Sequence, residues 1–279
     1  MSKTVYDVII IGAGVAGMTS AIYAKRAGKT VLLLEAKMHG GQIINTLNIA
    51  NWPGETSITG ADLSKKIYHQ VNNLGVEVRY EEAEEIRQSE EYGDLGDAED
   101  ETRPLWMVKT EDEEYLCSVI IIATGTEPRK LSEKQIKEAG KRPISYCATC
   151  DGALYKGKNV VVVGSGNTAK HEIAYLSNLA SKVFQIHHDD PIPEDAEAIF
   201  VAIGRVPNTT VVEGVVDIDK DGYIVAGEDC RTSAPGIFVA GDCRTKTLRQ
   251  LVTAVGDGAV AASEAVKYLN GGGHGGRSN

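Results

Sequence analysis

The sequence predicts an α/β protein built on two internal repeats of the βαβ type, one whole and one cut short. The first repeat begins with an apolar, β-branched run at residues 5–11, which is typical of a strand buried on both faces. A glycine-rich turn at 12–17, a helical stretch at 18–27 and a second apolar run at 31–34 follow it. This order of strand, turn, helix and strand is that of a Rossmann-like nucleotide-binding unit.

The second repeat has the same order further along the chain. It has an apolar run at 159–163, a glycine-containing turn at 164–169 and another apolar run at 182–186. A mononucleotide-binding half normally continues into a further helix and strand. Here residues 187–197 lead directly into an apolar run at 198–204. We therefore expect the second unit to be smaller than the first.

The composition is that of a soluble globular protein, and its charge limits the partners. The 279 residues carry a net charge of −10 at pH 7, so we expect no nucleic-acid or anionic-membrane binding, which needs a basic face. No apolar run approaches the roughly 20 residues that cross a bilayer. We also expect no secretion signal, because the residues before the first strand include no basic segment and no small-residue cleavage site. We expect a cytoplasmic protein, because five scattered cysteines do not make a secreted disulfide framework.

The first glycine-rich turn points to a dinucleotide ligand. Gly12, Gly14 and Gly17 form a GxGxxG pattern directly after a strand, and Glu35 ends the next strand. Glycines permit a tight turn and let backbone N–H groups approach a pyrophosphate. An acidic residue about 20 positions further on accepts hydrogen bonds from a ribose. A glycine-rich turn without a ligand is the alternative.

Small residues also end two other expected strands. Thr124 and Gly125 follow one apolar run, and Gly241 and Asp242 follow another. Small residues at these places let a ligand lie against the strand end, and the Asp242 carboxylate can accept hydrogen bonds from hydroxyl groups. A turn that serves only packing would have the same composition, so both interpretations stay open.

The pair Cys147 and Cys150, with Asp151 directly after it, predicts redox chemistry. Two cysteines separated by two residues can form a disulfide and reopen it, and Asp151 can transfer the protons involved. In a reducing cytosol such a pair is more often catalytic or metal-binding than structural. A zinc site would need a second short pair, which Cys230 and Cys243 do not form. We therefore expect a catalytic disulfide and no metal.

A locally basic segment, residues 128–146, precedes the cysteines. A solvated helix face is the ordinary explanation, and a docking surface for an acidic protein is the functional one. Its basic residues are Arg129, Lys130, Lys134, Lys137, Lys141 and Arg142.

Together these motifs resemble the low-molecular-weight flavin thioredoxin reductases. The resemblance implies an FAD-containing homodimer whose FAD-binding domain, 1–127 and 196–270, is split around an inserted domain, 128–195, that carries the cysteines. Residues 271–279 would be a flexible tail. The matching stretches occur in the family's order: IIGAGVAG (10–17), GGQ (40–42), NWPG (51–54), ATG (123–125), CATCDG (147–152), VVVGSGNTA (161–169), GIFVAGD (236–242) and RQLVTAVGDGA (249–259).

The resemblance also implies a role for each site residue. Cys150 would accept electrons from the flavin, Cys147 would be its disulfide partner, and Asp151 would be the acid or base. The implied substrate is thioredoxin. The implied FAD contacts are Gly12, Gly14 and Gly17 at the pyrophosphate, Glu35 at the adenosine ribose, Gly41, Gln42, Asn51, Thr124 and Gly125 near the flavin, and Gly241, Asp242, Arg249, Gln250 and Leu251 at the ribityl chain and isoalloxazine.

The sequence departs from that family at the segment that would bind the 2′-phosphate of NADPH. Where the family has a basic segment for the 2′-phosphate of NADPH, this chain has His187, His188, Asp189 and Asp190. Carboxylates repel a phosphate, because like charges ~4 Å apart cost on the order of 4 kcal/mol at an effective dielectric near 20.

The short second unit and these charges are most like the ferredoxin-dependent flavin thioredoxin reductases. We therefore expect reduced ferredoxin, or flavodoxin, to be the electron donor instead of NADPH. The alternatives are an NAD(P)H-dependent thioredoxin reductase with a shortened nucleotide domain, and a flavin-bearing redox sensor.

Overall fold

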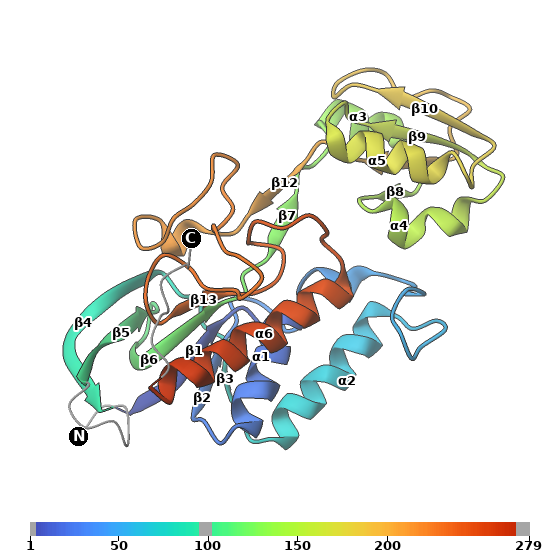
Figure 1. The fold of residues 1–279 in the computed structure, drawn as a ribbon. Coiled ribbons are helices and arrows are strands. Elements are labelled where there is room, and N and C mark those ends of the chain that lie inside the picture. Colours follow the sequence, from blue (N-terminus) through green and yellow to red (C-terminus); the bar gives the residue numbers. More distant parts are fainter. Residues whose placement is uncertain (1–3, 95–101, 272–279) are drawn as a thin grey trace. The chain divides into compact units, whose positions relative to one another are not determined.

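The computed structural model describes residues 4–94 and 102–271, which form two compact units (Figure 1). The tail expected at 271–279 lies outside the described residues from 272 onward. Unit 1 takes Met1–Leu47, Ile58–Thr126 and Pro207–Asn279 so far as these are described, and unit 2 takes Asn48–Ser57 and Glu127–Val206.

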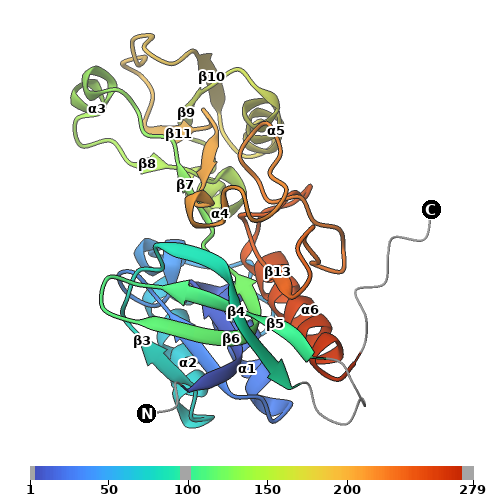
Figure 2. The same cartoon turned by 90° about the vertical axis from the view of Figure 1, so that its left-hand side faces the viewer.

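Unit 1 is built on a seven-stranded sheet. Its parallel strands have the order β3-β2-β1-β6, with β13 also beside β6. The antiparallel strands β4 and β5 extend the sheet from β6, as Figure 2 shows. The strands are β1 (Val5–Ile11), β2 (Val31–Leu34), β3 (Glu77–Arg79), β4 (Glu85–Asp94), β5 (Thr102–Lys109), β6 (Glu114–Ile122) and β13 (Ile237–Val239).

Strand β6 has two neighbours on one edge because it is long. Strand β1 pairs with it along most of its length, while β5 pairs with residues 114–117 and β13 with residues 120–122. The carboxyl ends of β1, β6 and β13 therefore lie side by side. In an open parallel sheet this is the edge at which ligands bind.

Both faces of the parallel sheet are buried, which explains the unbroken apolar runs. Val8 and Ile10 pack with the helices α1, α2 and α6 on one face (Figure 1), and Ile9 and Ile11 pack into a second cluster on the other. The helices are α1 (Val15–Arg26), α2 (Gly60–Asn73) and α6 (Leu251–Leu269), and the 3-10 helices of this unit are η1 (Gly41–Asn45) and η3 (Thr210–Val212).

Unit 2 contains a four-stranded parallel sheet of order β10-β9-β11-β8. Helices α3 and α5 cover opposite faces, since Ala139 and Leu176 pack with alternate residues of β9 and β11. The chain enters and leaves the unit through β7 (Thr126–Pro128) and β12 (Arg205–Pro207), which pair with each other. The remaining elements are β8 (Ile144–Ser145), β9 (Asn159–Val163), β10 (Lys182–Ile186), β11 (Ala198–Val201), α3 (Glu133–Ala139), α4 (Ala148–Asp151), α5 (Asn167–Leu176) and the 3-10 helix η2 (Gly152–Tyr155).

These two sheets confirm the expected α/β fold with Rossmann-like units. The short apolar stretch 222–225 does not form a strand, and Ile224 makes only isolated bridges. The reason is a tight turn in which the Asp219 carboxylate accepts the N–H groups of Asp221 and Tyr223. Within the described ranges, no helix is both long and apolar enough to span a lipid bilayer.

Candidate functional site

The first glycine-rich turn connects β1 to α1, and the space available for a side chain differs among its glycines. A Cβ on Gly12 would lie 2.5 Å from the Ala123 carbonyl oxygen, and one on Gly17 would lie 1.8 Å from the Gly12 oxygen. A Cβ on Gly14 would meet nothing within 4 Å. Gly12 and Gly17 are therefore required by the packing of the turn itself, whereas Gly14 borders open space.

The N-terminus of α1 is suited to an anion. Its N-cap, Gly14, makes no side-chain cap, and the first turn contains no acidic residue. The first N–H groups of a helix lack partners within the helix and carry the positive end of its dipole. The open space at Gly14 and these N–H groups together form a cradle for a phosphate group.

Glu35, just after β2, is held against this turn. Its Oε2 accepts the Ala13 N–H at 2.7 Å, and its Oε1 accepts the Lys37 N–H at 3.0 Å. Each carboxylate oxygen has a second lone pair, so both oxygens can also accept hydrogen bonds from two hydroxyl groups of a ribose.

Gly41 and Gln42 lie next to the same turn. A Cβ on Gly41 would lie 3.2 Å from the Gly14 Cα. The Gln42 amide donates to the Thr126 carbonyl oxygen at 2.6 Å, and a Cβ on Gly125 would lie 3.9 Å from its Nε2. The structure thus brings Gly41, Gln42 and Gly125 together with the glycine-rich turn.

Thr124 is fixed by a reciprocal contact with Asn208. The Thr124 hydroxyl donates to the Asn208 carbonyl oxygen, and the Asn208 side-chain amide donates to the Thr124 carbonyl oxygen at 3.2 Å. Asn51 is the exception among the expected contacts. It lies in Asn48–Ser57, which groups with unit 2 and not with the turn.

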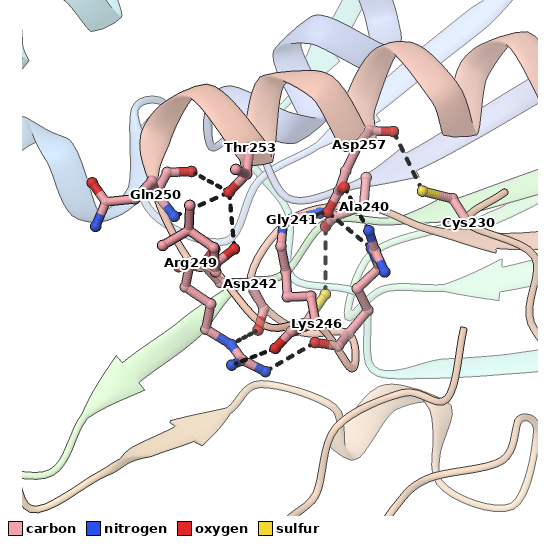
Figure 3. Close-up of polar contacts among 12 residues, drawn as sticks. Cys230, Ala240, Gly241, Asp242, Lys246, Arg249, Gln250, Thr253 and Asp257 are labelled. Carbon is pink, nitrogen blue, oxygen red and sulfur yellow. Dashed lines mark hydrogen bonds and ion pairs between the residues drawn. The ribbon is translucent and has the colours of Figure 1, made fainter. Parts of the chain in front are cut away.

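The loop 241–250 leads from β13 to α6, and Arg249 shapes it (Figure 3). The Arg249 guanidinium lies 4.0 Å above the ring of Tyr223, measured from its Cζ. It donates hydrogen bonds to the carbonyl oxygens of Asp242, Lys246 and Arg244, at 3.2, 3.2 and 3.0 Å. The Arg249 side chain therefore stabilises the backbone of its own loop.

Gln250 and Leu251 form the start of α6. Gln250 is the N-cap and forms a reciprocal capping box with Thr253, whose hydroxyl accepts the Gln250 N–H at 3.1 Å. The pair satisfies N–H groups that the helix leaves without partners. Gly241 has φ of +85°, a conformation that favours glycine, and it lies against Ala16 at the start of α1.

In unit 2, Cys147 and Cys150 form a disulfide with a Cα–Cα distance of 5.3 Å. Cys147 is the N-cap of α4, and its carbonyl oxygen accepts the N–H groups of Cys150 and Asp151. One helical turn therefore brings both sulfurs together.

Asp151 lies next to the disulfide through Ser145. The Ser145 hydroxyl donates to Asp151 Oδ2 at 2.6 Å, and its oxygen accepts the Cys147 N–H at 3.2 Å. Asp151 is half-buried. A carboxylate in this place can take up or release a proton close to the cysteines.

Glu172 is a second carboxyl group beside the cysteine pair. It belongs to α5, and its Oε1 accepts the Ala148 N–H at 3.4 Å, while its buried Oε2 has no hydrogen-bond partner among the described residues. Burial raises the pKa of Glu172, and the Ala148 hydrogen bond and the charge of Arg205 only partly offset this.

Replacing Glu172 by glutamine is expected to stabilise the protein at neutral pH and not at acid pH. Because the pKa of Glu172 is raised in the folded state, its protonation stabilises the fold fully at pH values below the unfolded pKa of about 4.3. This contribution to the stability is lost as the pH rises through the pKa of the folded state. Glutamine stays neutral, so the thermal midpoint of E172Q relative to wild type should increase with pH.

Glu197→Gln is the matched control. Hydrogen bonding to Lys158 lowers the pKa of the exposed Glu197. The contribution of Glu197 to the stability is therefore present above its unfolded pKa and is lost as the pH falls. The thermal midpoint of E197Q relative to wild type should therefore decrease with pH, and the change should be small because the ion pair is exposed. A pH-independent difference for E172Q would contradict the burial argument.

The second glycine-rich turn, between β9 and α5, borders a cavity of about 280 Å³. The N-cap of α5 is Gly166, which makes no side-chain cap. His188 also lines the cavity, and its Nδ1 lies 3.1 Å from Asp189 Oδ2. The other lining residues are Gly164, Ser165, Thr168, Ala202, Ile203 and Gly204.

The remaining cysteines are buried free thiols in unit 1. Burial raises the pKa of the Cys117 and Cys243 thiols, and it raises the pKa of Cys230 to about 12. Thiols of raised pKa react slowly, because the thiolate is the nucleophile. No group of three potential metal ligands is present in the part of the chain that the structure describes.

Glu172 and Asp257 are two carboxyl groups of the structure that sequence reasoning did not select. Glu172 shares a helix face with the buried Ala169 and Leu176, at spacings of three and four residues. Asp257 is the only charged residue between 251 and 263. An acid on a buried face, or alone in an apolar helix, could have indicated both.

The sequence profile of the pyridine nucleotide-disulphide oxidoreductase family matches residues 6–196 and 189–258. The chain belongs to this family. The two matched stretches of this pyridine nucleotide-disulphide oxidoreductase overlap at 189–196, in the connection between β10 and β11.

Within the family the chain is a homologue of thioredoxin reductases. It is 35% identical to the thioredoxin reductase of Bacillus subtilis (strain 168) over 315 aligned positions, which cover 96% of each chain. The solved thioredoxin reductase of Streptococcus pyogenes has a TM-score of 0.84 at 32% identity, covering 97% of this chain and 100% of that one. Because 315 positions exceed the 279 residues of this chain, the relative contains residues that are missing here.

A ferredoxin-flavin thioredoxin reductase from Clostridium acetobutylicum is a more distant structural neighbour. It has a TM-score of 0.59 at 26% identity and covers 97% of this chain and 99% of that one.

FAD is the cofactor of this pyridine nucleotide-disulphide oxidoreductase. The residues of unit 1 fit the group: open space at Gly14 and the uncapped start of α1 suit the pyrophosphate, and the fixed Glu35 carboxylate suits the ribose. The small residues at the ends of β6 and β13 leave the adjoining sheet edge accessible to the flavin half.

Proposed function

We propose that this chain is a cytoplasmic, homodimeric thioredoxin reductase that takes its electrons from reduced ferredoxin. The electrons would pass through FAD to Cys147 and Cys150 and then to thioredoxin. The observation that carries the choice of donor is the short second unit, in which only residues 187–197 separate β10 from β11.

The thioredoxin substrate is supported by the named relatives and by the disulfide itself. Reduction of the Cys147–Cys150 bond takes up two electrons and two protons. One cysteine, as a thiolate, then attacks the substrate disulfide, and the other displaces the reduced substrate from the mixed disulfide. Asp151, held through Ser145, is placed to accept and return the protons of this exchange.

The donor assignment is supported by what surrounds the second glycine-rich turn. Asp189 and Asp190 follow β10, where the 2′-phosphate of NADPH would need cations. The short connection between β10 and β11 leaves little chain to form a wall for a nicotinamide. FAD can accept electrons one at a time from a single-electron donor and pass two electrons to a disulfide.

Unit 2 also presents a basic surface to which an acidic iron–sulfur protein could bind. Five of the six basic residues in the segment 128–146 are exposed: Arg129, Lys130, Lys134, Lys137 and Lys141. Arg142 differs, because its guanidinium donates to the carbonyl oxygens of Ala139 and Pro193. Arg142 thus belongs to the fold of the unit and not to its docking surface.

A pyridine nucleotide donor is the second candidate, and the cavity at Gly164 and Gly166 favours it. The turn and the uncapped start of α5 can hold a phosphate. The nearby carboxylates would then prefer NADH to NADPH.

Anaerobic mixing with each donor tests the proposal. We expect reduced ferredoxin to bleach the flavin absorbance rapidly, at a rate that falls with ionic strength because charge steers the encounter. NADPH and NADH should bleach it slowly. Rapid bleaching by micromolar NADPH or NADH would contradict the ferredoxin assignment, and failure of the reduced enzyme to reduce added thioredoxin would favour a redox sensor.

A further inference from the structure

The loop 241–250 is fastened from within by one buried carboxylate of α6 (Figure 3). Arg244 makes a β-bridge with Ile224, so the chain is extended there, and side chains two residues apart face the same side. Arg244 and Lys246 both reach Asp257, with relative side-chain exposures of 5% and 6%. The loop is thus attached to α6 by the residues that it buries.

Four donors converge on Asp257. Its Oδ2 accepts the Gly241 N–H at 3.0 Å, Arg244 Nε at 2.9 Å and Lys246 Nζ at 2.7 Å, and its Oδ1 accepts Arg244 Nη2 at 2.8 Å. A carboxylate has about four lone-pair sites, and these donors share them unevenly, three at Oδ2 and one at Oδ1. Burial acts to raise the pKa of Asp257, but the hydrogen bonds from Arg244 and Lys246 outweigh it and lower the pKa.

The contacts connect both ends of the loop. The Gly241 N–H lies two residues after the end of β13 and directly before Asp242. At the other end, Gln250 caps the same helix that carries Asp257, about two turns earlier. Asp257 therefore sets the position of Asp242 relative to the start of α6.

We propose that Asp257 is the positioning residue of the flavin site, holding the loop 241–250 in the shape that binds the flavin half of FAD. The inference rests on the FAD site proposed for Asp242 and the start of α6. Loss of the carboxylate leaves Arg244 and Lys246 as buried cations without their counter-charge, which is strongly unfavourable. The loop must then move to hydrate them, and Asp242 moves with it.

Titration of the apoprotein with FAD tests this, with quenching of FAD fluorescence as the readout. We expect Asp257→Asn to weaken FAD binding by about tenfold or more, because it breaks a buried charge pair. Lys246→Met removes one donor but keeps the Arg244–Asp257 pair, so it should fold and weaken FAD binding by a few-fold. If D257N does not fold, K246M decides alone, and wild-type FAD affinity in K246M would then overturn the proposal.

Glu264→Gln is the matched control, since Glu264 lies on α6 and pairs with Arg231 at 2.7 Å. It should lower the thermal midpoint of the apoprotein without changing FAD affinity. Equal FAD affinity in D257N and wild type, or an equal loss in D257N and E264Q, would overturn the positioning role. Asp242→Asn separates the two claims: if it binds FAD normally, the proposed flavin site is wrong, and if only D242N weakens binding, the role of Asp257 is wrong.

Discussion

Replacing Cys150 by serine is expected to abolish thioredoxin reduction while FAD stays bound. The serine variant cannot form the disulfide that accepts the electron pair, so turnover should fall on the order of 10⁴-fold or more, as when a catalytic nucleophile is removed. The glycine-rich turn that we expect to bind FAD belongs to unit 1, and Cys150 belongs to unit 2. The flavin absorbance per protein should therefore equal that of wild type.

Cys117→Ser provides the control for this experiment. Cys117 is a fully buried thiol of the sheet core in unit 1, so its replacement should cost some stability and leave turnover nearly unchanged. Thioredoxin reduction by C150S at a rate near that of wild type would show that the electrons do not pass through the Cys147–Cys150 pair.

Gly17→Ala and Gly14→Ala are expected to fail in different ways. A Cβ at Gly17 would lie 1.8 Å from the Gly12 carbonyl oxygen, so the turn between β1 and α1 cannot keep its shape, and unit 1 should lose both stability and FAD. A Cβ at Gly14 meets no protein atom within 4 Å. G14A should therefore fold normally and bind FAD more weakly, because the methyl group occupies the space beside the helix N-terminus.

The two measurements are the thermal midpoint of the apoprotein and its affinity for FAD. For G17A we expect a midpoint lowered by several degrees or an insoluble protein, since a steric conflict of this kind costs a few kcal/mol. Gly256→Ala is the control, because a Cβ added at this position of α6 would meet nothing within 4 Å and alanine favours a helix. Unchanged FAD affinity in G14A would mean that the pyrophosphate lies elsewhere.

Several features of the site follow from sequence because they are local. The fold of each unit follows from apolar runs separated by glycine-rich turns, and these runs became β1, β2, β9 and β10. The proximity of Cys147 to Cys150 follows from a spacing that fits one helical turn. In such cases the interacting groups are neighbours in the chain, so their types and spacing suffice.

Contacts between distant residues were decided only by the tertiary structure. Glu172 meets Ala148 from 24 residues away, and Arg244 and Lys246 meet Asp257 because α6 packs beside the loop that follows β13. The direction in which a long side chain points is also decided only by the tertiary structure. Arg142 and Arg249 read as surface or ligand-binding cations in the sequence, yet both donate to backbone carbonyl oxygens.

The sequence by itself thus determined the α/β fold, the glycine-rich turn between β1 and α1, and the Cys147–Cys150 pair. The tertiary structure decided which carboxyl groups lie in partly or fully buried places, namely the half-buried Glu172 at the disulfide and the buried Asp257 behind the loop 241–250. The physical reason is that the charge state and hydrogen bonds of a buried group depend on the elements packed around it. Those elements come from distant parts of the chain, which no local pattern specifies.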